Sequence, residues 1–191
     1  MEFEHKQIRA VFDERTIRVY QAYSPAIAEE AVRLGTFGGR FSLTRMTWIK
    51  PSFLWMMYRC GWAEKPGQER VLAIDITRGG FDFAVNNAVA SSVGASGISA
   101  EEWKRRVAES DIRVQWDPEK DVYGNSLPYR SIQLGLRGQA VRAYVSEWIV
   151  GVSDITDYVH ELNAKRRNGT DITELLPKEH IYTVKQEENH D

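Results

Sequence analysis

Period-two patterns mark the strands expected in this chain. Alternating or continuous apolar residues, many of them β-branched or aromatic, are typical of strands. Such runs occupy residues 16–22, 70–77, 112–116, 129–136 and 147–152. A long connection rich in turn residues separates residues 112–116 from residues 129–136, so we expect these two strands to pair antiparallel.

Helical periodicity and capping residues delimit the helices between these strands. Ser24 and Pro25 form a strong helix start, and Gly35 ends the helix that follows. The helices are expected at 26–34, 52–60, 81–90, 100–107, 138–145 and 154–164. The elements are mixed without a regular βαβ order, which favours an α+β fold. We expect a mainly antiparallel sheet, continuous or split, flanked by helices.

The central stretch, residues 46–59, is the richest in aromatic residues and methionine. Residues 48–50 read as the end of an extended segment, Pro51 fits the first turn of a helix, and Gly61 is a suitable stop. This helix is apolar nearly all round, which is typical of a buried helix. Lys50, Ser52 and Arg59 then need partners, because an unpaired buried charge is costly. Either an internal carboxylate holds them, or they face a polar or anionic ligand.

Composition and length narrow the class of protein. The 191 residues suit one domain over 1–191. In the tail, residues 165–191, an apolar patch is expected to dock on this domain, and the acidic end of the tail is expected to be disordered. No apolar run is long enough to span a bilayer, and the N-terminus lacks a signal-peptide core, so we expect a cytoplasmic protein without membrane contact. One cysteine and four scattered histidines predict no metal site.

The net charge of −2 hides an uneven distribution. Basic residues outnumber acidic ones across residues 33–70, where tryptophan and tyrosine are interleaved. Such a region can bind the phosphates of a nucleic acid, or it can be a solvated surface. The residues assigned to nucleic-acid phosphates are Arg40, Arg45, Lys50 and Arg130.

Three further polar residues are candidates for a cleft. Glu147 stands at the expected start of an apolar strand, where a carboxylate can line a cleft while the strand stays buried. Arg18 and Gln21 lie on opposite faces of the first strand, so only one of them can point into a given cleft. Surface pairing is the alternative for all three.

Five segments resemble a known family. Residues 46–59 and 61–74, together with 18–23, 127–133 and 147–150, are similar to the family called domain of unknown function 4291. The match covers most of the chain. The family name implies no activity.

The order of the elements also resembles the compact ADP-ribosyltransferase fold. This resemblance implies an enzyme that binds NAD and transfers ADP-ribose, with nucleic acid as one acceptor. It implies that Glu147 stabilises the oxocarbenium charge that develops when the nicotinamide–ribose bond breaks. The resemblance assigns the pyrophosphate of NAD to Arg18 or Arg59. It assigns the residue stacked on nicotinamide to Tyr20, Trp48 or Trp55. The other residues assigned to NAD are Gln21, Lys50 and Ser52. A non-catalytic nucleic-acid-binding module built on residues 33–70, and a domain without a ligand, are the alternatives.

Overall fold

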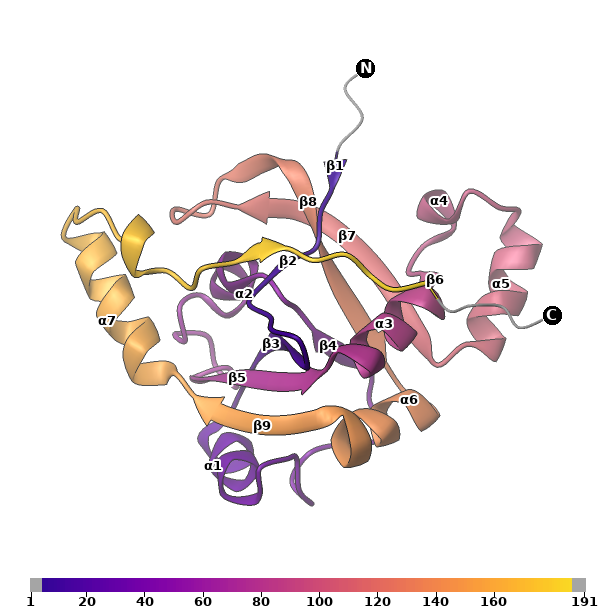
Figure 1. Ribbon diagram of the computed structural model, residues 1–191, viewed down its shortest axis with the longest axis horizontal. Helices are drawn as coiled ribbons and strands as arrows, with labels where there is room; N and C mark the ends of the chain where they lie inside the picture. Colours follow the sequence, from indigo (N-terminus) through magenta and orange to yellow (C-terminus); the bar gives the residue numbers. More distant parts are fainter. Residues whose placement is uncertain (1–4, 187–191) are drawn as a thin grey trace.

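The computed structural model describes residues 5–186 and has an α+β architecture (Figure 1). The strands are β1 (His5–Lys6), β2 (Arg9–Ala10), β3 (Thr16–Tyr23), β4 (Thr47–Ile49), β5 (Arg70–Thr77), β6 (Val89–Ala90), β7 (Ile112–Lys120), β8 (Ser126–Leu136), β9 (Ile149–Asp154) and β10 (His180–Ile181). The helices are α1 (Pro25–Leu34), α2 (Phe53–Cys60), α3 (Arg78–Asn86), α4 (Val93–Ser96), α5 (Ala100–Glu109), α6 (Gly138–Ala143), the π-helix η1 (Tyr144–Trp148), α7 (Thr156–Arg167) and the 3₁₀ helix η2 (Thr173–Leu175).

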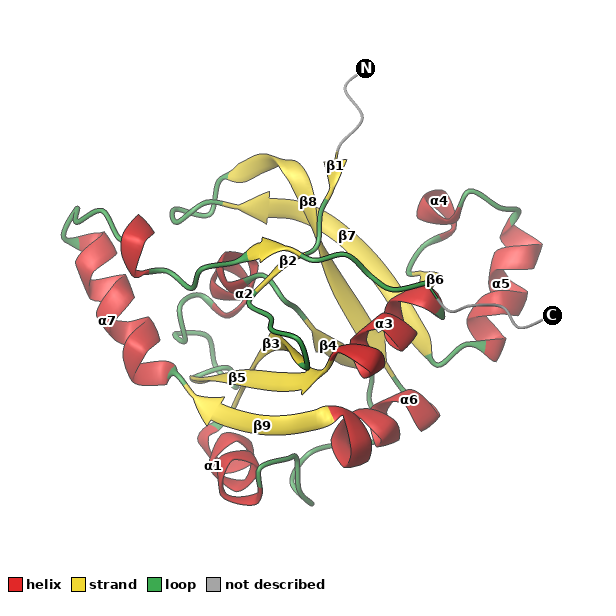
Figure 2. Ribbon diagram, in the orientation of Figure 1, coloured by secondary structure: helices red, strands yellow, loops and turns green. Residues whose placement is uncertain are grey.

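The strands are divided between two main sheets and one short pair. The larger sheet has the order β1-β8-β7-β6, and β4 pairs with β8 as well. The second sheet has the order β3-β5-β9, and β10 pairs with β2. Pairing is antiparallel except between β1 and β8 and between β6 and β7. The expected fold class, α+β with mainly antiparallel strands and flanking helices, is therefore confirmed, and the sheet is split. Figure 2 shows α7 at one end of the molecule and α4 and α5 at the other.

Strands β3 and β5 separate two apolar clusters, because their side chains alternate between the two faces of the sheet. Ile17 and Val19 of β3 pack in the larger cluster, between the two sheets, whereas Tyr20 packs in the smaller one. The smaller cluster includes the buried face of α2 and residues of α7. Strands buried on both faces read as nearly continuous apolar runs, which is the pattern seen over residues 70–77.

The two sheets approach each other where β3 meets the end of β4. The backbone N–H of Tyr20 donates to the carbonyl of Lys50 at 2.7 Å in an isolated antiparallel bridge. On its other side β4 pairs with β8, with Thr47 opposite Leu136. Strand β4 thus connects the sheets, and residues that are about 30 positions apart in the chain, as Gln21 and Lys50 are, line one space.

Helix α2 begins one residue later than its sequence indicates. Ser52, not a residue before Pro51, is the N-cap, and its hydroxyl accepts from the N–H of Trp55 at 3.1 Å. Pro51 therefore precedes the cap and does not occupy the first helical turn. The end of the helix is as expected: Gly61 has φ +59° and accommodates the left-handed C-cap.

Two further differences from the expected boundaries concern candidate site residues. Strand β7 continues through Lys120, so that Asp117 belongs to the strand and not to the following connection. Glu147 does not open a strand but lies in η1, which continues α6, and β9 begins only at Ile149. A π-helical turn after α6 extends the helical conformation past the point where β-branched composition suggested a strand.

The segment after α7 runs back across the molecule. Ile172 and Tyr182 are buried, and the Tyr182 hydroxyl donates to Asp82 at 2.7 Å. The disorder expected at the end of the chain concerns residues 187–191, which lie outside the described residues. Within residues 5–186, no helix has both the length and the apolar character that crossing a membrane requires.

Candidate functional site

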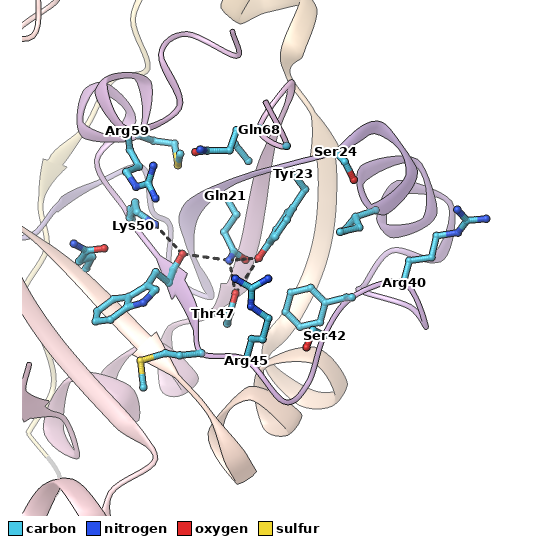
Figure 3. Close-up of a pocket in the computed structure, with 18 of the residues that line it drawn as sticks. Gln21, Tyr23, Ser24, Arg40, Ser42, Arg45, Thr47, Lys50, Arg59 and Gln68 are labelled. Carbon is cyan, nitrogen blue, oxygen red and sulfur yellow. Dashed lines mark hydrogen bonds between the residues drawn. The ribbon is translucent and has the colours of Figure 1, made fainter. Parts of the chain in front are cut away.

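A cleft of about 890 Å³ opens where the two sheets meet (Figure 3). Strands β3, β4, β7 and β8, helix α2, the loop before β4 and the turn before β5 all contribute to it. The polar and charged residues that line it are Gln21, Tyr23, Ser24, Arg40, Ser42, Arg45, Thr47, Lys50, Arg59, Gln68, Gln115 and Gln133.

Positive charge dominates this cleft. Arg40, Arg45, Lys50 and Arg59 line it, and no aspartate or glutamate is among the described lining residues. Within the described part of the chain, none of these four side chains forms an ion pair. A concave site lined by unneutralised charge of one sign focuses the electrostatic potential. The cleft therefore attracts anions.

A hydrogen-bonded group fixes the polar wall formed by β3 and β4. The Gln21 amide nitrogen donates to the Thr47 hydroxyl at 2.7 Å and to the Tyr23 hydroxyl at 2.8 Å. The Tyr144 hydroxyl donates to the Gln21 amide oxygen at 2.7 Å. Burial raises the pKa of Tyr23 to about 12, so its hydroxyl stays protonated. These bonds hold the Gln21 amide in one orientation, and Gln21 is only 2% exposed.

The Trp48 indole lies against a glycine of β8. Gly135 pairs with Trp48, and a Cβ atom at Gly135 would lie 2.6 Å from the Met46 sulfur and 3.0 Å from the Trp48 ring. The missing side chain therefore allows two cleft-lining residues to pack flat on the sheet. A glycine inside a strand often marks such a close approach, so Gly135 was a signal for this wall in the sequence.

Two glutamines on the large sheet hold a carboxylate next to the cleft. Gln115 and Gln133 are opposite each other on β7 and β8, and both line the cleft. Their amide nitrogens donate to Asp117 at 2.8 and 2.6 Å. The sequence interpretation placed Asp117 in a solvated turn and missed both glutamines. The signal for Asp117 was the alternation of β7, had it been extended past Trp116, whereas Gln115 and Gln133 already lay inside the two strands expected to pair.

Lys50 is the most unusual group of the cleft. It is 6% exposed, its Nζ donates to the Trp48 carbonyl at 3.0 Å, and Nζ lies 5.7 Å from the centre of the Trp55 ring. Burial, and next the nearby Arg59 charge, lower the pKa of Lys50 to about 7. Asp117 acts in the opposite direction, but its effect is smaller than that of Arg59.

The structure brings part of the predicted site together. Gln21, Trp48, Lys50 and Arg59, assigned to NAD, line the cleft, and so do Arg40 and Arg45, assigned to nucleic-acid phosphates. Gln21 points into the cleft, and Arg18 points elsewhere, as their opposite faces on β3 require.

The remaining predicted residues lie outside the cleft lining. Arg18 forms a two-pronged ion pair with Asp75 on β5, at 2.8 and 2.9 Å. Tyr20 is buried in the smaller apolar cluster, Trp55 is buried beside Lys50 and Tyr58, and Arg130 donates to the Trp116 carbonyl at 3.0 Å. Glu147 is exposed on η1 and does not reach the cleft, because the helical turn carries its side chain to the surface.

Ser52 faces a separate buried acidic group. Its hydroxyl donates to Glu119 at 2.9 Å, and Glu179 accepts from the Phe53 N–H at 2.8 Å. Burial raises the pKa of Glu119 and brings that of Glu179 to about 8. The internal carboxylate expected near α2 therefore exists, but it holds Ser52 and the start of α2 and not Arg59.

Comparison with known proteins gives one result. Residues 7–182 match the family described as Domain of unknown function (DUF4291), and this description names no activity. No curated protein matches the chain. Because the matched segment spans nearly the whole sequence and contains every residue that lines the cleft, the chain belongs to the DUF4291 family.

Proposed function

We propose that this protein binds the diphosphate of a dinucleotide, with NAD as the candidate ligand, in the cleft between the two sheets. The observation that carries the proposal is the convergence of Arg45, Lys50 and Arg59 on a cleft whose described lining residues include no carboxylate. Small-ligand sites commonly enclose roughly 300–1,000 Å³, and the volume of about 890 Å³ falls in this range.

The chemistry of the lining suits such a ligand. Arginine remains charged at all accessible pH values and binds phosphate oxygens through two parallel hydrogen bonds. We assign the phosphates to Arg45 and Arg59, because the Arg40 side chain points away from the cleft (Figure 3). Trp48 offers an aromatic surface for a base or for nicotinamide, and the Gln68 amide offers a donor and an acceptor for polar edges.

Transfer of ADP-ribose is the reaction that follows from this proposal. Breaking the nicotinamide–ribose bond needs a negative charge beside the developing oxocarbenium ion. Asp117 lies behind the cleft-lining Gln115 and Gln133, which both donate to it, and we assign its negative charge this role, acting from behind the lining, in place of Glu147. The acceptor is a group that enters the same cleft, and a nucleic-acid strand fits its positive charge.

NAD is expected to stabilise the protein in a thermal-shift experiment. At a concentration about 100 times Kd, a ligand stabilises by about 2.7 kcal/mol, which corresponds to about 5–10 °C for a chain of this size. The double variant Arg45→Gln/Arg59→Gln is expected to bind about 100- to 10,000-fold more weakly, since each of the two lost charge-assisted bonds contributes about 1.5–3 kcal/mol. Both arginines are exposed, so the fold should persist.

The matched control is Arg15→Gln, on the exposed turn before β3 and outside the cleft. It should bind like the native protein. A single-stranded oligonucleotide is the second ligand to titrate. If the oligonucleotide binds with a slope of log affinity against log salt near −3, as about four phosphate contacts predict, while NAD and ADP-ribose cause no shift, the cleft is a nucleic-acid site and the dinucleotide proposal is wrong.

Turnover of NAD is expected to depend on Asp117 and not on Glu147. Asp117→Asn keeps the size of the side chain but removes the charge, and a drop of about 100-fold in the rate of nicotinamide release is expected. Glu147→Gln changes an exposed residue outside the cleft and should leave the rate within twofold. This limit corresponds to a change of about 0.4 kcal/mol in the activation free energy. Loss of activity in Glu147→Gln together with full activity in Asp117→Asn would reverse the assignment.

A further inference from the structure

The Lys50 side chain is a buried amine without a counter-charge. Among the described residues no carboxylate lies within 4.0 Å of its Nζ, which has one hydrogen-bond acceptor, the Trp48 carbonyl. Below it lies the Trp55 ring. A lysine tied down for structure alone would be expected to meet a carboxylate, because a buried unpaired charge is costly.

The charged groups around Lys50 favour its neutral form. Arg59 of α2 faces it with a like charge, and Asp117 of β7 provides a weaker opposing effect. Burial is the largest cause, and together these effects lower the pKa of Lys50 to about 7. A large fraction of the molecules therefore carries an unprotonated amine at neutral pH, whereas exposed lysines are almost fully protonated.

The position of Lys50 gives this amine access to a ligand. Figure 3 shows Lys50 beside Arg59, with Arg45 across the same cleft. A ligand whose phosphate binds the arginines can therefore extend toward the Lys50 amine. Desolvated lysines next to another cation are a known kind of activated nucleophile for carbonyl groups.

We propose that Lys50 is a carbonyl-reactive lysine that forms an imine with a phosphorylated aldehyde or ketone bound in the cleft. The Nζ lone pair attacks the carbonyl carbon, a proton moves from nitrogen to oxygen, and the carbinolamine loses water to leave a C=N bond. One amine and one carbonyl give one imine and one water, so no oxidant or reductant is consumed. Only the anchoring of the phosphate rests on the proposed function.

The test uses the full chain with two reagents, pyridoxal 5′-phosphate and pyridoxal, and each rate at Lys50 is divided by the rate at the exposed Lys104, because pyridoxal also closes to a less reactive hemiacetal. Borohydride then reduces the imine to a stable secondary amine, and peptide mapping locates the label. Lys50 is expected to be labelled first, and about tenfold faster by the phosphorylated aldehyde, as one charge-assisted contact predicts. The labelling rate should rise with pH through a midpoint near the pKa of about 7.

Three variants make the result specific. Lys50→Arg and Lys50→Met should lose the fast label, and Lys104→Met, which changes an exposed lysine of α5, should retain it. Label spread evenly over exposed lysines, or an unchanged pattern in Lys50→Met, would overturn the imine proposal.

The two reagents also separate this proposal from the proposed function. Equal labelling of Lys50 by both aldehydes would support the imine and contradict phosphate binding in the cleft. Stabilisation of the protein by NAD without labelling of Lys50 by either aldehyde would contradict the imine and leave dinucleotide binding intact.

Discussion

A Gly135→Val protein is expected to lose the packing of Trp48 in the cleft and to unfold at a lower urea concentration than the native protein. The first added carbon would already lie 2.6 Å from the Met46 sulfur and 3.0 Å from the Trp48 ring. Valine adds two further methyl groups, so the indole must leave the face of β8. Overpacking of this kind usually costs about 1–3 kcal/mol, and loss of one wall should weaken ligand binding as well.

Gly151→Ala is the matched control for this variant. Gly151 also lies in a strand, β9, but a Cβ atom there meets nothing within 4 Å. This control should keep or slightly raise the stability, because alanine restricts the unfolded chain more than glycine does. If Gly135→Val and Gly151→Ala have the same urea midpoint, the close approach of Trp48 to β8 does not determine the stability of this wall.

Replacing Lys50 by methionine is expected to stabilise the protein near and below neutral pH. Methionine keeps the length of the side chain without a charge that must be desolvated. Burial lowers the pKa of Lys50 from 10.5 to about 7, so below pH 7 the buried charge destabilises the native fold by an amount on the order of a few kcal/mol. The methionine variant is free of this cost. Urea denaturation at pH 6 should show this gain, and the same variant should have lost the reactive amine.

The pH dependence of stability is a second indication that Lys50 is desolvated in the folded protein. Because the folded pKa of Lys50 is below the unfolded value, the unfolded chain binds more protons between about pH 7 and 10.5, and the native stability gains from rising pH there. Glu179, whose pKa is raised to about 8, acts in the opposite sense, since the folded state holds its proton and loses stability as pH rises through that value.

Glu179 is present in both proteins, so its contribution cancels when the free energy of unfolding of the native protein is subtracted from that of Lys50→Met. This difference should be largest below about pH 7 and should shrink toward pH 10.5. Lys104→Met, on an exposed position of α5, should show no such trend. A constant difference at all pH values would mean that Lys50 is not desolvated in the folded protein.

The sequence alone determined the features that depend on neighbouring residues. Strand β5 has the predicted limits, and α1 begins at Pro25 and ends before Gly35 as its capping residues indicate. The separation of Arg18 from Gln21 follows from the two-residue period of a strand, which needs no knowledge of the fold. The same local rules failed at Glu147, because a π-helical turn extends α6 over residues of strand-like composition.

Only the tertiary structure decided which polar groups meet. Arg18 finds Asp75 57 residues away, and Ser52 finds Glu119 67 residues away, through the register of paired strands and the docking of α2. Lys50 is a further example. Its sequence neighbours predicted that it precedes a buried helix, but its low pKa arises from burial where the two sheets meet. Pairing partners, burial and charge depend on distances through space, and those are set by packing between segments far apart in the chain.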